Sequence, residues 1–214
     1  MTRGAFIVVE GLDRSGKTTQ TELLAERLTT NGVSVERRKF PDRTTGTGHL
    51  IDAYLHGTTD LDDHAIHLLF SANRWEAAAS LEATLASGTL VLSDRYAFSG
   101  VAFSAAKGNS SLPLAWCRAP DVGLPAPDLV LFLDLAPEEA AARGGYGEER
   151  YEKEALQARV RTVFKDLGSQ TSGWVTIDAG QDPAAVTHEI LKHVEPLVQG
   201  IDAPIGKLWV DDDA

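Results

Sequence analysis

The stretch Gly11-Leu-Asp-Arg-Ser-Gly16-Lys17-Thr18 decides how this chain folds. It fits the pattern G-x-x-x-x-G-K-[ST] in full, directly after an apolar run at 5–10 and at the start of a helical pattern. Between a strand and a helix, the backbone N–H groups of such a loop surround phosphate groups, and the positive end of the helix adds to the attraction. The lysine contacts the β- and γ-phosphates, and the threonine hydroxyl holds Mg²⁺. The stretch therefore predicts a nucleotide-binding α/β fold.

Strand and helix patterns alternate outward from this loop along the whole chain. Strands are predicted at 5–10, 33–40, 89–94, 128–134 and 174–178, and the helical patterns fall at 16–30, 47–56, 61–86, 96–106, 137–142, 152–167 and 183–198. This alternation predicts a five-stranded parallel sheet flanked by helices on both faces, with right-handed crossovers. Ligands of such sheets bind beyond the carboxyl ends of the strands. We expect one domain over 1–214, with a loop at 108–127 and a disordered tail at 210–214.

The composition narrows the class of protein. The chain carries 31 acidic and 20 basic residues, which gives a formal net charge of −11 and leads us to expect no nucleic-acid partner. No apolar run approaches the roughly 18 residues of a membrane-spanning helix, so no membrane contact is expected, and the N-terminus has no signal-peptide pattern. The single cysteine, Cys117, cannot form an internal disulfide and is expected to be a buried filler. A reducing location, the cytoplasm or also the nucleus, fits these features.

The phosphate-binding loop alone does not separate kinases from GTPases or transport ATPases. A GTPase would need a guanine-reading N-K-x-D, which the sequence lacks, and Asp178-Ala-Gly-Gln181 has neither the spacing nor the position of a GTPase switch. A transport ATPase would carry a second signature on a longer chain. His64 and His67 lie three apart on a helix without a third metal ligand in view, so they are expected to be ordinary helix residues. These exclusions favour a small-molecule kinase.

Three further motifs lie at predicted strand ends or on the long helix. Phe40-Pro41-Asp-Arg43 follows the second strand, and Asp94-Arg95-Tyr closes the third. Phe70 and Arg74 are four residues apart, so they share a face of the helix at 61–86. A negatively charged acceptor must approach ATP, and arginine forks can neutralise and orient both phosphate groups. The motifs therefore predict a nucleotide acceptor site beside the phosphate-binding loop.

Together with the phosphate-binding loop, these residues resemble thymidylate kinase, and the match is close to the eukaryotic form. The resemblance extends over nearly the whole chain and includes the stretches Phe70–Trp75, Asp94–Phe103, Pro120–Pro125, Glu149–Glu152 and Pro204–Trp209. It implies the P-loop nucleoside monophosphate kinase fold, a homodimer, and transfer of the γ-phosphoryl group of ATP to dTMP with Mg²⁺. The product would be dTDP, on the route to dTTP.

The resemblance also assigns residues to each ligand. The implied ATP site comprises Arg14, Ser15, Gly16, Lys17, Thr18, Thr19, Arg143, Asp178, Ala179 and Gln181. The implied dTMP site comprises Asp13, Phe40, Pro41, Arg43, Phe70, Arg74, Arg95, Ser99, Gly100, Phe103, Tyr151 and Gln157. Mg²⁺ would be held, partly through water, by Thr18 and Asp94. The implied catalytic residues are Arg14, Lys17, Asp94 and Arg95.

Roles at the acceptor follow from the same resemblance. Arg43 and Arg95 would hold the acceptor phosphate. The thymine ring would stack on Phe70, while Arg74 would donate to a base carbonyl. The sugar 3′-hydroxyl would donate to Asp13.

The lid is assigned in the same way. Thymidylate kinases with an arginine in the phosphate-binding loop usually have few basic groups in the lid. The lid at 143–151 is glycine-rich and acidic, which fits the presence of Arg14, and a built-in arginine of this kind can contribute roughly 10³-fold or more to the rate. Arg143 would stack on adenine, while Tyr151 and Gln157 would approach the acceptor as the lid closes.

Several alternatives stay open. Phe103 fits a core position as well as it fits a wall beside the sugar that disfavours a ribose 2′-hydroxyl, the role that the resemblance implies. Arg43 could be a solvated loop charge, Phe70 a core residue and Asp94 a helix cap. The acceptor could be dUMP or UMP, since the fold suits either. A nucleotide-binding regulator without catalysis is a third hypothesis, against which the presence of Lys17 argues.

Overall fold

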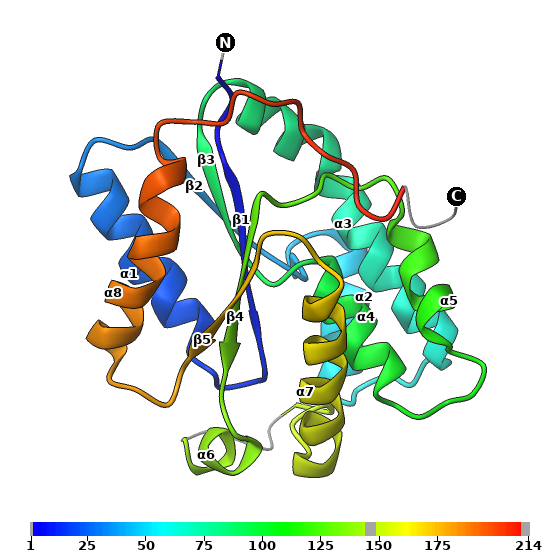
Figure 1. Ribbon diagram of the computed structural model, residues 1–214. Helices are drawn as coiled ribbons and strands as arrows, with labels where there is room; N and C mark the ends of the chain where they lie inside the picture. The colour runs from blue at the N-terminus through cyan, green and yellow to red at the C-terminus, as the bar shows by residue number, and fades with distance from the viewer. Residues whose placement is uncertain (1, 144–148, 211–214) are drawn as a thin grey trace.

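A computed structural model describes residues 2–143 and 149–210 of the chain. Figure 1 shows a central parallel sheet in the order β2-β3-β1-β4-β5. Its strands are β1 (Phe6–Gly11), β2 (Val35–Lys39), β3 (Leu90–Asp94), β4 (Leu129–Asp134) and β5 (Trp174–Asp178). The predicted five-stranded parallel sheet is confirmed. Within it, the register pairs Lys39 of β2 with Asp94 of β3, so polar side chains meet where these strands end.

Helices cover both faces of this sheet, as predicted. One face carries α1 (Lys17–Thr30) and α8 (Pro183–Val194), and the other carries α2 (Gly46–Leu55), α3 (Asp63–Ala86), α4 (Ala97–Ala105), α5 (Leu114–Arg118) and α7 (Glu154–Ser169). The short helix α6 (Pro137–Ala142) lies at the carboxyl end of the sheet in Figure 1. All described elements between β1 and α8 therefore belong to one three-layered body.

The strand sequences explain why both faces are covered. In β1, Phe6 and Val8 belong to one apolar core cluster, whereas Ile7 and Val9 belong to a second cluster with residues of α1 and α8. Side chains of a strand alternate between the two faces of its sheet, so a continuous apolar run needs an apolar layer on each side. All six residues of β1 are buried. The uninterrupted apolar runs of the sequence thus predict the layered architecture.

The segment 108–127, which was predicted as a loop, contains the short helix α5 and a 3₁₀ turn at Ala119–Asp121. Five residues are too few to display a helical period, so no pattern indicated this helix. The helix predicted at 183–198 ends at Val194 and continues as a 3₁₀ turn at Glu195–Leu197. Pro196 accounts for that end, because proline lacks the N–H that an α-helix requires.

Cys117 is buried, as expected, and the helix residue His67 is buried beside it. His67 is fully buried, and its ring nitrogens lie 2.7 Å from the Ser104 hydroxyl and 2.9 Å from the Cys117 carbonyl oxygen. Burial raises the pKa of the Cys117 thiol to about 11, so it is no nucleophile at neutral pH. Among the residues that the structure describes, no three His, Cys, Asp or Glu side chains are grouped so as to hold a metal ion.

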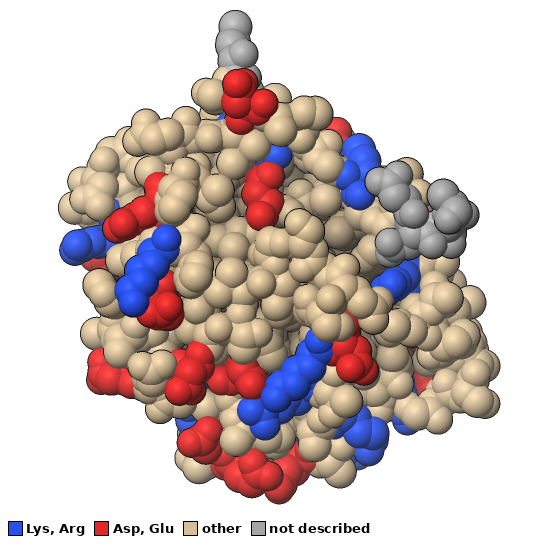
Figure 2. Space-filling model, viewed as in Figure 1, with Lys and Arg blue, Asp and Glu red and all other residues tan. Residues whose placement is uncertain are grey.

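The outer surface carries charges of both signs. Figure 2 shows acidic and basic side chains spread over this face, with acidic side chains gathered at the end of the molecule where Figure 1 places α6. That end is also the carboxyl end of the strands. No helix in the described part of the chain combines the length and the apolar character that crossing a bilayer requires.

Candidate active site

The phosphate-binding loop follows β1 and leads into α1. Gly11 has φ 154°, and a Cβ placed there would lie 2.8 Å from the Leu133 carbonyl oxygen, so only glycine fits this approach to β4. Gly16 has φ 96° and is the N-cap of α1. Because these two glycines turn the chain sharply, the loop places the N-terminus of a 14-residue helix behind the space where phosphates would lie.

Lys17 lies at the start of α1 and is almost completely buried. Its ammonium group donates to the Leu12 carbonyl oxygen at 2.5 Å, within the loop itself. Burial, with the nearby Arg95 guanidinium adding to the effect, lowers the pKa of Lys17 to about 7. A partly dehydrated ammonium group in this position is poised to exchange a single carbonyl oxygen for phosphate oxygens.

The next residue, Thr18, connects the loop to β3. Its hydroxyl donates to Asp94 Oδ2 at 2.6 Å, and the Lys39 ammonium lies 3.6 Å from the same carboxylate oxygen. Burial acts to raise the pKa of Asp94, but the charges of Lys17, Arg95 and Lys39 and the hydrogen bond from Thr18 together outweigh it and hold that pKa below its usual value. Asp94 is therefore a carboxylate at neutral pH, and it forms a group of hard oxygen ligands with Thr18.

A cavity of about 280 Å³ opens between this loop, the ends of β2 and β3, and helices α2, α3 and α4. Its lining includes fifteen of the predicted residues: Asp13, Arg14, Lys17, Thr18, Phe40, Pro41, Arg43, Phe70, Arg74, Asp94, Arg95, Ser99, Gly100, Phe103 and Tyr151. The guanidinium-bearing residues Arg43, Arg74 and Arg95 come from three separate motifs but meet here. An acceptor site of the predicted kind requires that these three arginines line one cavity, and they do.

Two of the arginines are paired with carboxylates of the segment at 149–152. Arg43 donates to Glu149 at 2.8 Å through Nη2 and to Asp52 at 2.7 Å through Nη1. Arg14 donates from Nε to Glu152 at 3.1 Å. Arg14 has a positive φ of 63°, a conformation that costs a residue other than glycine roughly 1 kcal/mol. Such strain is typical of functional sites.

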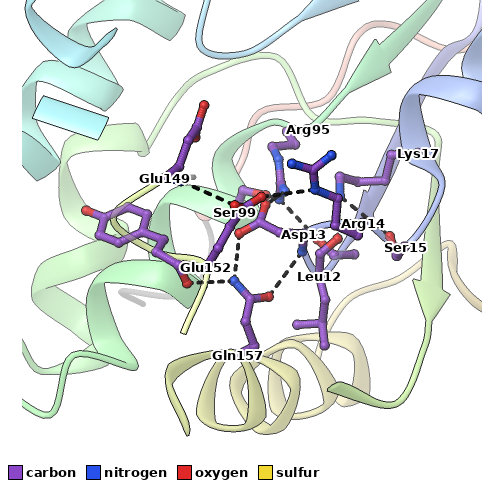
Figure 3. A network of polar contacts seen from close by, with 12 residues as sticks. Leu12, Asp13, Arg14, Ser15, Lys17, Arg95, Ser99, Glu149, Glu152 and Gln157 are labelled. Carbon is purple, nitrogen blue, oxygen red and sulfur yellow. Dashed lines mark hydrogen bonds and ion pairs between the residues drawn. The ribbon is translucent and has the colours of Figure 1, made fainter. Parts of the chain in front are cut away.

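Arg95 is held by a polar network at the centre of Figure 3. It donates to the Asp13 carboxylate through Nη2, and to the Gly11 carbonyl oxygen and the Ser99 hydroxyl, both at 3.0 Å, through Nη1. Ser99 in turn donates to the fully buried Glu10 at 2.5 Å. Desolvation raises the pKa of Glu10, although its hydrogen bonds from Ser99 act against this effect. The network fixes Arg95 between the loop and α4.

Arg74 is paired more deeply than the other arginines. Its Nε and Nη2 donate to the two carboxylate oxygens of Asp121, at 3.1 and 2.6 Å. The side chains of Arg74 and Asp121 are 3% and 0% exposed, so this ion pair is shielded from water. A bidentate pair of this kind leaves the orientation of the guanidinium plane little freedom.

Aromatic side chains form the remaining wall. Phe40 is buried, and its peptide bond to Pro41 is cis. Phe103 is buried and stacks on Tyr151, with ring centroids 5.5 Å apart, and the Arg95 guanidinium lies 5.3 Å from its ring centre. Phe70 is half-buried and reaches both the core and the cavity. Phe103 is therefore both a buried core residue and part of the cavity wall, so the two alternatives do not exclude each other.

Eight predicted residues do not line the cavity: Ser15, Gly16, Thr19, Gln157, Arg143, Asp178, Ala179 and Gln181. Arg143 nevertheless brings several of the implied ATP residues together, because it donates to the carbonyl oxygens of Arg14 and Ala179, both at 2.9 Å. It thereby joins the phosphate-binding loop to the turn after β5.

Gln157 is fully buried in α7 and contacts Asp13 instead of facing the cavity (Figure 3). Its side-chain amide donates to Asp13 Oδ2 at 2.6 Å and to the Tyr151 carbonyl oxygen at 2.9 Å. Any influence on the acceptor is therefore exerted through these two neighbours.

The predicted lid at 143–151 is described only at its ends, because 144–148 lie outside the described residues, as do 211–214 of the predicted tail. At the second end, the Arg150 backbone N–H donates to the Leu55 carbonyl oxygen at 2.9 Å, and its guanidinium lies 4.2 Å from the Tyr54 ring centre. This end of the lid is thus fastened to the C-terminal turn of α2.

Several residues of the site were not singled out from the sequence. These are Glu10, Lys39, Asp52, Asp121, Glu149 and Glu152, which pair with or face the predicted residues. Lys39 directly precedes the Phe40-Pro41 motif, so its position at the end of a predicted strand could have indicated that it belongs to the site. Asp121 lies in the Pro120–Pro125 stretch that carried part of the resemblance. Glu149 and Glu152 likewise lie in the Glu149–Glu152 stretch of that resemblance, whereas Glu10 and Asp52 have no pattern of their own in one sequence.

Comparisons with known proteins agree with one another. The family model of thymidylate kinase matches residues 9–190. The chain is 47% identical to thymidylate kinase of Homo sapiens over 209 residues, which cover 97% of this chain and 98% of that protein. It is 49% identical to the Arabidopsis thaliana thymidylate kinase over 211 residues, which cover 97% and 78%. A solved structure of thymidylate kinase from Candida albicans is similar with a TM-score of 0.89 at 36% identity, covering 97% of this chain and 99% of that one.

Proposed function

The chain belongs to the thymidylate kinase family, and from this premise we propose that its cavity transfers the γ-phosphoryl group of ATP to dTMP, giving dTDP and ADP for dTTP synthesis. One observation carries the assignment of residues: Lys17 on the donor side and Arg43, Arg74 and Arg95 on the acceptor side line the same cavity. Two anions that repel each other can be brought into contact where fixed positive charges face both, and phosphoryl transfer gains chiefly from such positioning.

The donor phosphates would lie against the glycine loop. Lys17 would leave the Leu12 carbonyl oxygen for the β- and γ-phosphates, and the backbone N–H groups at 16–19 would donate to phosphate oxygens. Adenine would lie beside Arg143, against the turn at Asp178–Gln181. The two 2.9 Å hydrogen bonds of Arg143 to the loop and to this turn support that placement.

Mg²⁺ fits the oxygens at the start of α1. Thr18 offers a hydroxyl and Asp94 an ionised carboxylate 2.6 Å away, which is the hard oxygen chemistry that Mg²⁺ prefers. These two residues would hold the ion, Asp94 partly through water, and the ion would neutralise charge on the transferring phosphates. Lys39, now 3.6 Å from Asp94, carries the charge that Mg²⁺ would replace there.

The acceptor phosphate would be held by Arg43 and Arg95. Both guanidinium groups face the cavity while paired with carboxylates, Arg43 with Glu149 and Arg95 with Asp13. The phosphate would replace these partners, and the freed Asp13 would accept from the sugar 3′-hydroxyl. Binding of dTMP is thus an exchange of one anion for another on the same two arginines.

The base and sugar would lie deeper in the cavity. Phe70 would stack on the thymine ring, and Arg74 would donate to a base carbonyl. Phe103, held by its contact with Tyr151, would stand where a ribose 2′-hydroxyl would project. Ser99 and Gly100 complete the wall on α4.

Arg14 is proposed as the group that stabilises the transferring phosphoryl group. It lies at the tip of the loop, lines the cavity and is held in its strained conformation next to Lys17. An arginine that neutralises charge developing between donor and acceptor contributes on the order of 10³-fold to the rate.

An acceptor panel tests the function. Purified protein with Mg-ATP is mixed with dTMP, dUMP, UMP, AMP and GMP, and ADP release is followed at several acceptor concentrations. We expect saturable release with dTMP and little with AMP or GMP. A folded, ATP-binding preparation that turns over no acceptor would instead favour a regulator without catalysis.

A broader acceptor range is the second candidate within the same fold. The structurally similar Candida albicans enzyme is described as having broad substrate specificity. A preference for UMP over dTMP in the panel would remove the role given to Phe103, because a ribose 2′-hydroxyl would then be tolerated.

The family resemblance also favours a homodimer. Leu68 and Trp75 are 48% and 44% exposed, and they lie seven residues apart on one face of α3. Leu50 of α2 is 53% exposed as well. Covering these apolar side chains against a second copy would remove them from water. The cytoplasm, or also the nucleus, is the proposed location, where dTMP and ATP are available.

A further inference from the structure

The carboxylate of Asp121 accepts three hydrogen bonds in a site without exposed surface. Ser71 donates to Oδ1 at 2.7 Å, and Arg74 donates to Oδ1 from Nε and to Oδ2 from Nη2. Asp121 is 0% exposed, so it cannot exchange these donors for water. A carboxylate saturated in this way is itself immobile, and it holds two of the three guanidinium nitrogens of Arg74.

The third nitrogen, Nη1, is left for the cavity. It makes no hydrogen bond to any residue of the described ranges, and Arg74 is part of the cavity lining. Since a guanidinium group has donors only, Nη1 can pair with a carbonyl oxygen but not with an amino group. A thymine or uracil ring offers such an oxygen, whereas a cytosine ring has an amino group at the corresponding position.

Gly100 of α4 fixes the same guanidinium from the other side. A Cβ at this position would lie 2.7 Å from Arg74 Nη2 and 3.0 Å from Nη1, closer than side-chain contacts allow. The φ of Gly100 is not positive, and it lies inside a helix, where glycine is less favourable than alanine by about 0.8–1 kcal/mol. Backbone geometry therefore does not require glycine here, but the position of Arg74 does.

We propose that Asp121 and Gly100 are positioning residues for base selection: they hold Arg74 so that only Nη1 is presented to the acceptor, which selects pyrimidines with a carbonyl in place of an amino group. The inference rests on the proposed base contact of Arg74. It adds that selectivity comes from the immobility of the guanidinium. If the guanidinium could turn aside, its donor would no longer face the amino group of cytosine, and the repulsion that excludes cytosine would be lost.

Four variants test this inference: Asp121→Asn, Gly100→Ala, Arg74→Ala, and the double variant of Asp121 and Arg74. KM and kcat are measured for dTMP and dCMP, with KM for ATP as a second readout. We expect Asp121→Asn and Gly100→Ala to raise KM for dTMP about tenfold, to lower the preference for dTMP over dCMP by a similar factor, and to leave kcat and KM for ATP within about threefold. Adding Asp121→Asn to Arg74→Ala should raise KM for dTMP no further.

Gly100→Ala separates positioning from stability. Alanine favours the helix and so offsets part of the cost of shifting the guanidinium. The variant should therefore stay folded, which its melting temperature checks, and a weaker dTMP affinity would then come from the displaced guanidinium. Gly46→Ala at the start of α2 is the matched control, because a Cβ there meets nothing within 4 Å. Should Asp121→Asn fail to fold, Gly100→Ala decides alone, since it shifts the guanidinium but removes neither charge of the buried ion pair.

The outcomes distinguish the inference from its premise. An unchanged KM for dTMP in Arg74→Ala would remove the proposed base contact itself. A raised KM in Arg74→Ala, with Gly100→Ala and any folded Asp121→Asn like the wild type for dTMP and dCMP, would leave the base contact standing and overturn the positioning role.

Discussion

Glu149 accepts a hydrogen bond from Nη2 of Arg43 at 2.8 Å, so a carboxylate of the lid segment occupies the guanidinium that we assign to the acceptor phosphate. Asp52 accepts from Nη1 of the same side chain at 2.7 Å. The Arg43 guanidinium is thus paired with two carboxylates of the protein. The acceptor phosphate must displace them, and the protein's own carboxylates act as competitors for it.

Replacing Glu149 by glutamine should therefore strengthen dTMP binding. The Arg43 and Glu149 side chains are 37% and 30% exposed, and partly exposed pairs contribute about 0.2–1 kcal/mol, so KM for dTMP should fall by up to about fivefold at low salt. The gain should shrink in 0.5 M salt because screening weakens the competing pair. Steady-state kinetics at both salt concentrations measure it. Glu189→Gln, which removes the same charge from a pair with Lys192 on α8, is the control, and an equal KM in both variants would refute the competition.

Arg14 can be tested with two substitutions that differ in backbone strain. Arg14→Ala and Arg14→Gly both remove the guanidinium, and we expect each to lower kcat by about 10²–10³-fold while KM for dTMP stays within a few-fold. Since residue 14 has φ 63°, glycine relieves strain that alanine retains, so only Arg14→Gly should keep or raise the melting temperature. Equal kcat in wild type and Arg14→Gly would show that this side chain does not stabilise the transfer.

The sequence predicts the site well where a motif sits at the end of a strand. Arg43 and Arg95 follow β2 and β3, and the carboxyl ends of adjacent parallel strands must meet at one edge. Which carboxylate pairs with which arginine is less predictable. Asp121 pairs with Arg74 across 47 positions of the chain, and no local pattern specifies a contact that tertiary packing creates.

Element boundaries show the same division between local and tertiary information. The strand β1 was predicted because the consecutive apolar residues at 5–9 are typical of a strand that is buried on both faces. The helix α5 was missed because Leu114–Arg118 is too short to show a helical period. Its one buried residue, Cys117, contacts His67 through its carbonyl oxygen, a tertiary contact that no local pattern indicates. Gln157 was expected near the acceptor, whereas helix α7 turns it inward to Asp13.

The exposed apolar face of α3 predicts the effect of a charge there on association. Leu68→Glu should convert the proposed dimer to a monomer, because burying the exposed half of Leu68 in both copies would contribute about 2 kcal/mol, or roughly 30-fold in the dissociation constant, and a buried carboxylate would cost more. Sedimentation velocity over a range of protein concentrations measures this. Leu23→Glu on α1, a side chain 38% exposed on the opposite face of the sheet, is the matched control. The same mass for wild type and Leu68→Glu at all concentrations would exclude α3 as the interface.

The pKa of Lys17 makes ATP binding a proton-linked event. Burial lowers this pKa to about 7, whereas the unfolded lysine keeps its proton up to about pH 10.5. Between those values the unfolded chain binds more protons than the folded one, so the contribution of Lys17 to the free energy of unfolding increases as pH rises. Phosphate groups of ATP beside the ammonium reverse this effect by favouring its charged form, which raises the pKa in the complex.

ATP binding at pH 8 should consequently take up about 0.9 proton per site, and about 0.5 at pH 7, as expected for a group that titrates near 7 when free and stays protonated when bound. Isothermal titration calorimetry in two buffers of different ionisation enthalpy measures the uptake. Lys17→Arg supplies the control, because its guanidinium is charged at both pH values and has no proton to gain. If the wild type and Lys17→Arg took up equal numbers of protons at pH 8, the linkage would belong to another group, and the buried ammonium of Lys17 would already be charged before ATP arrives.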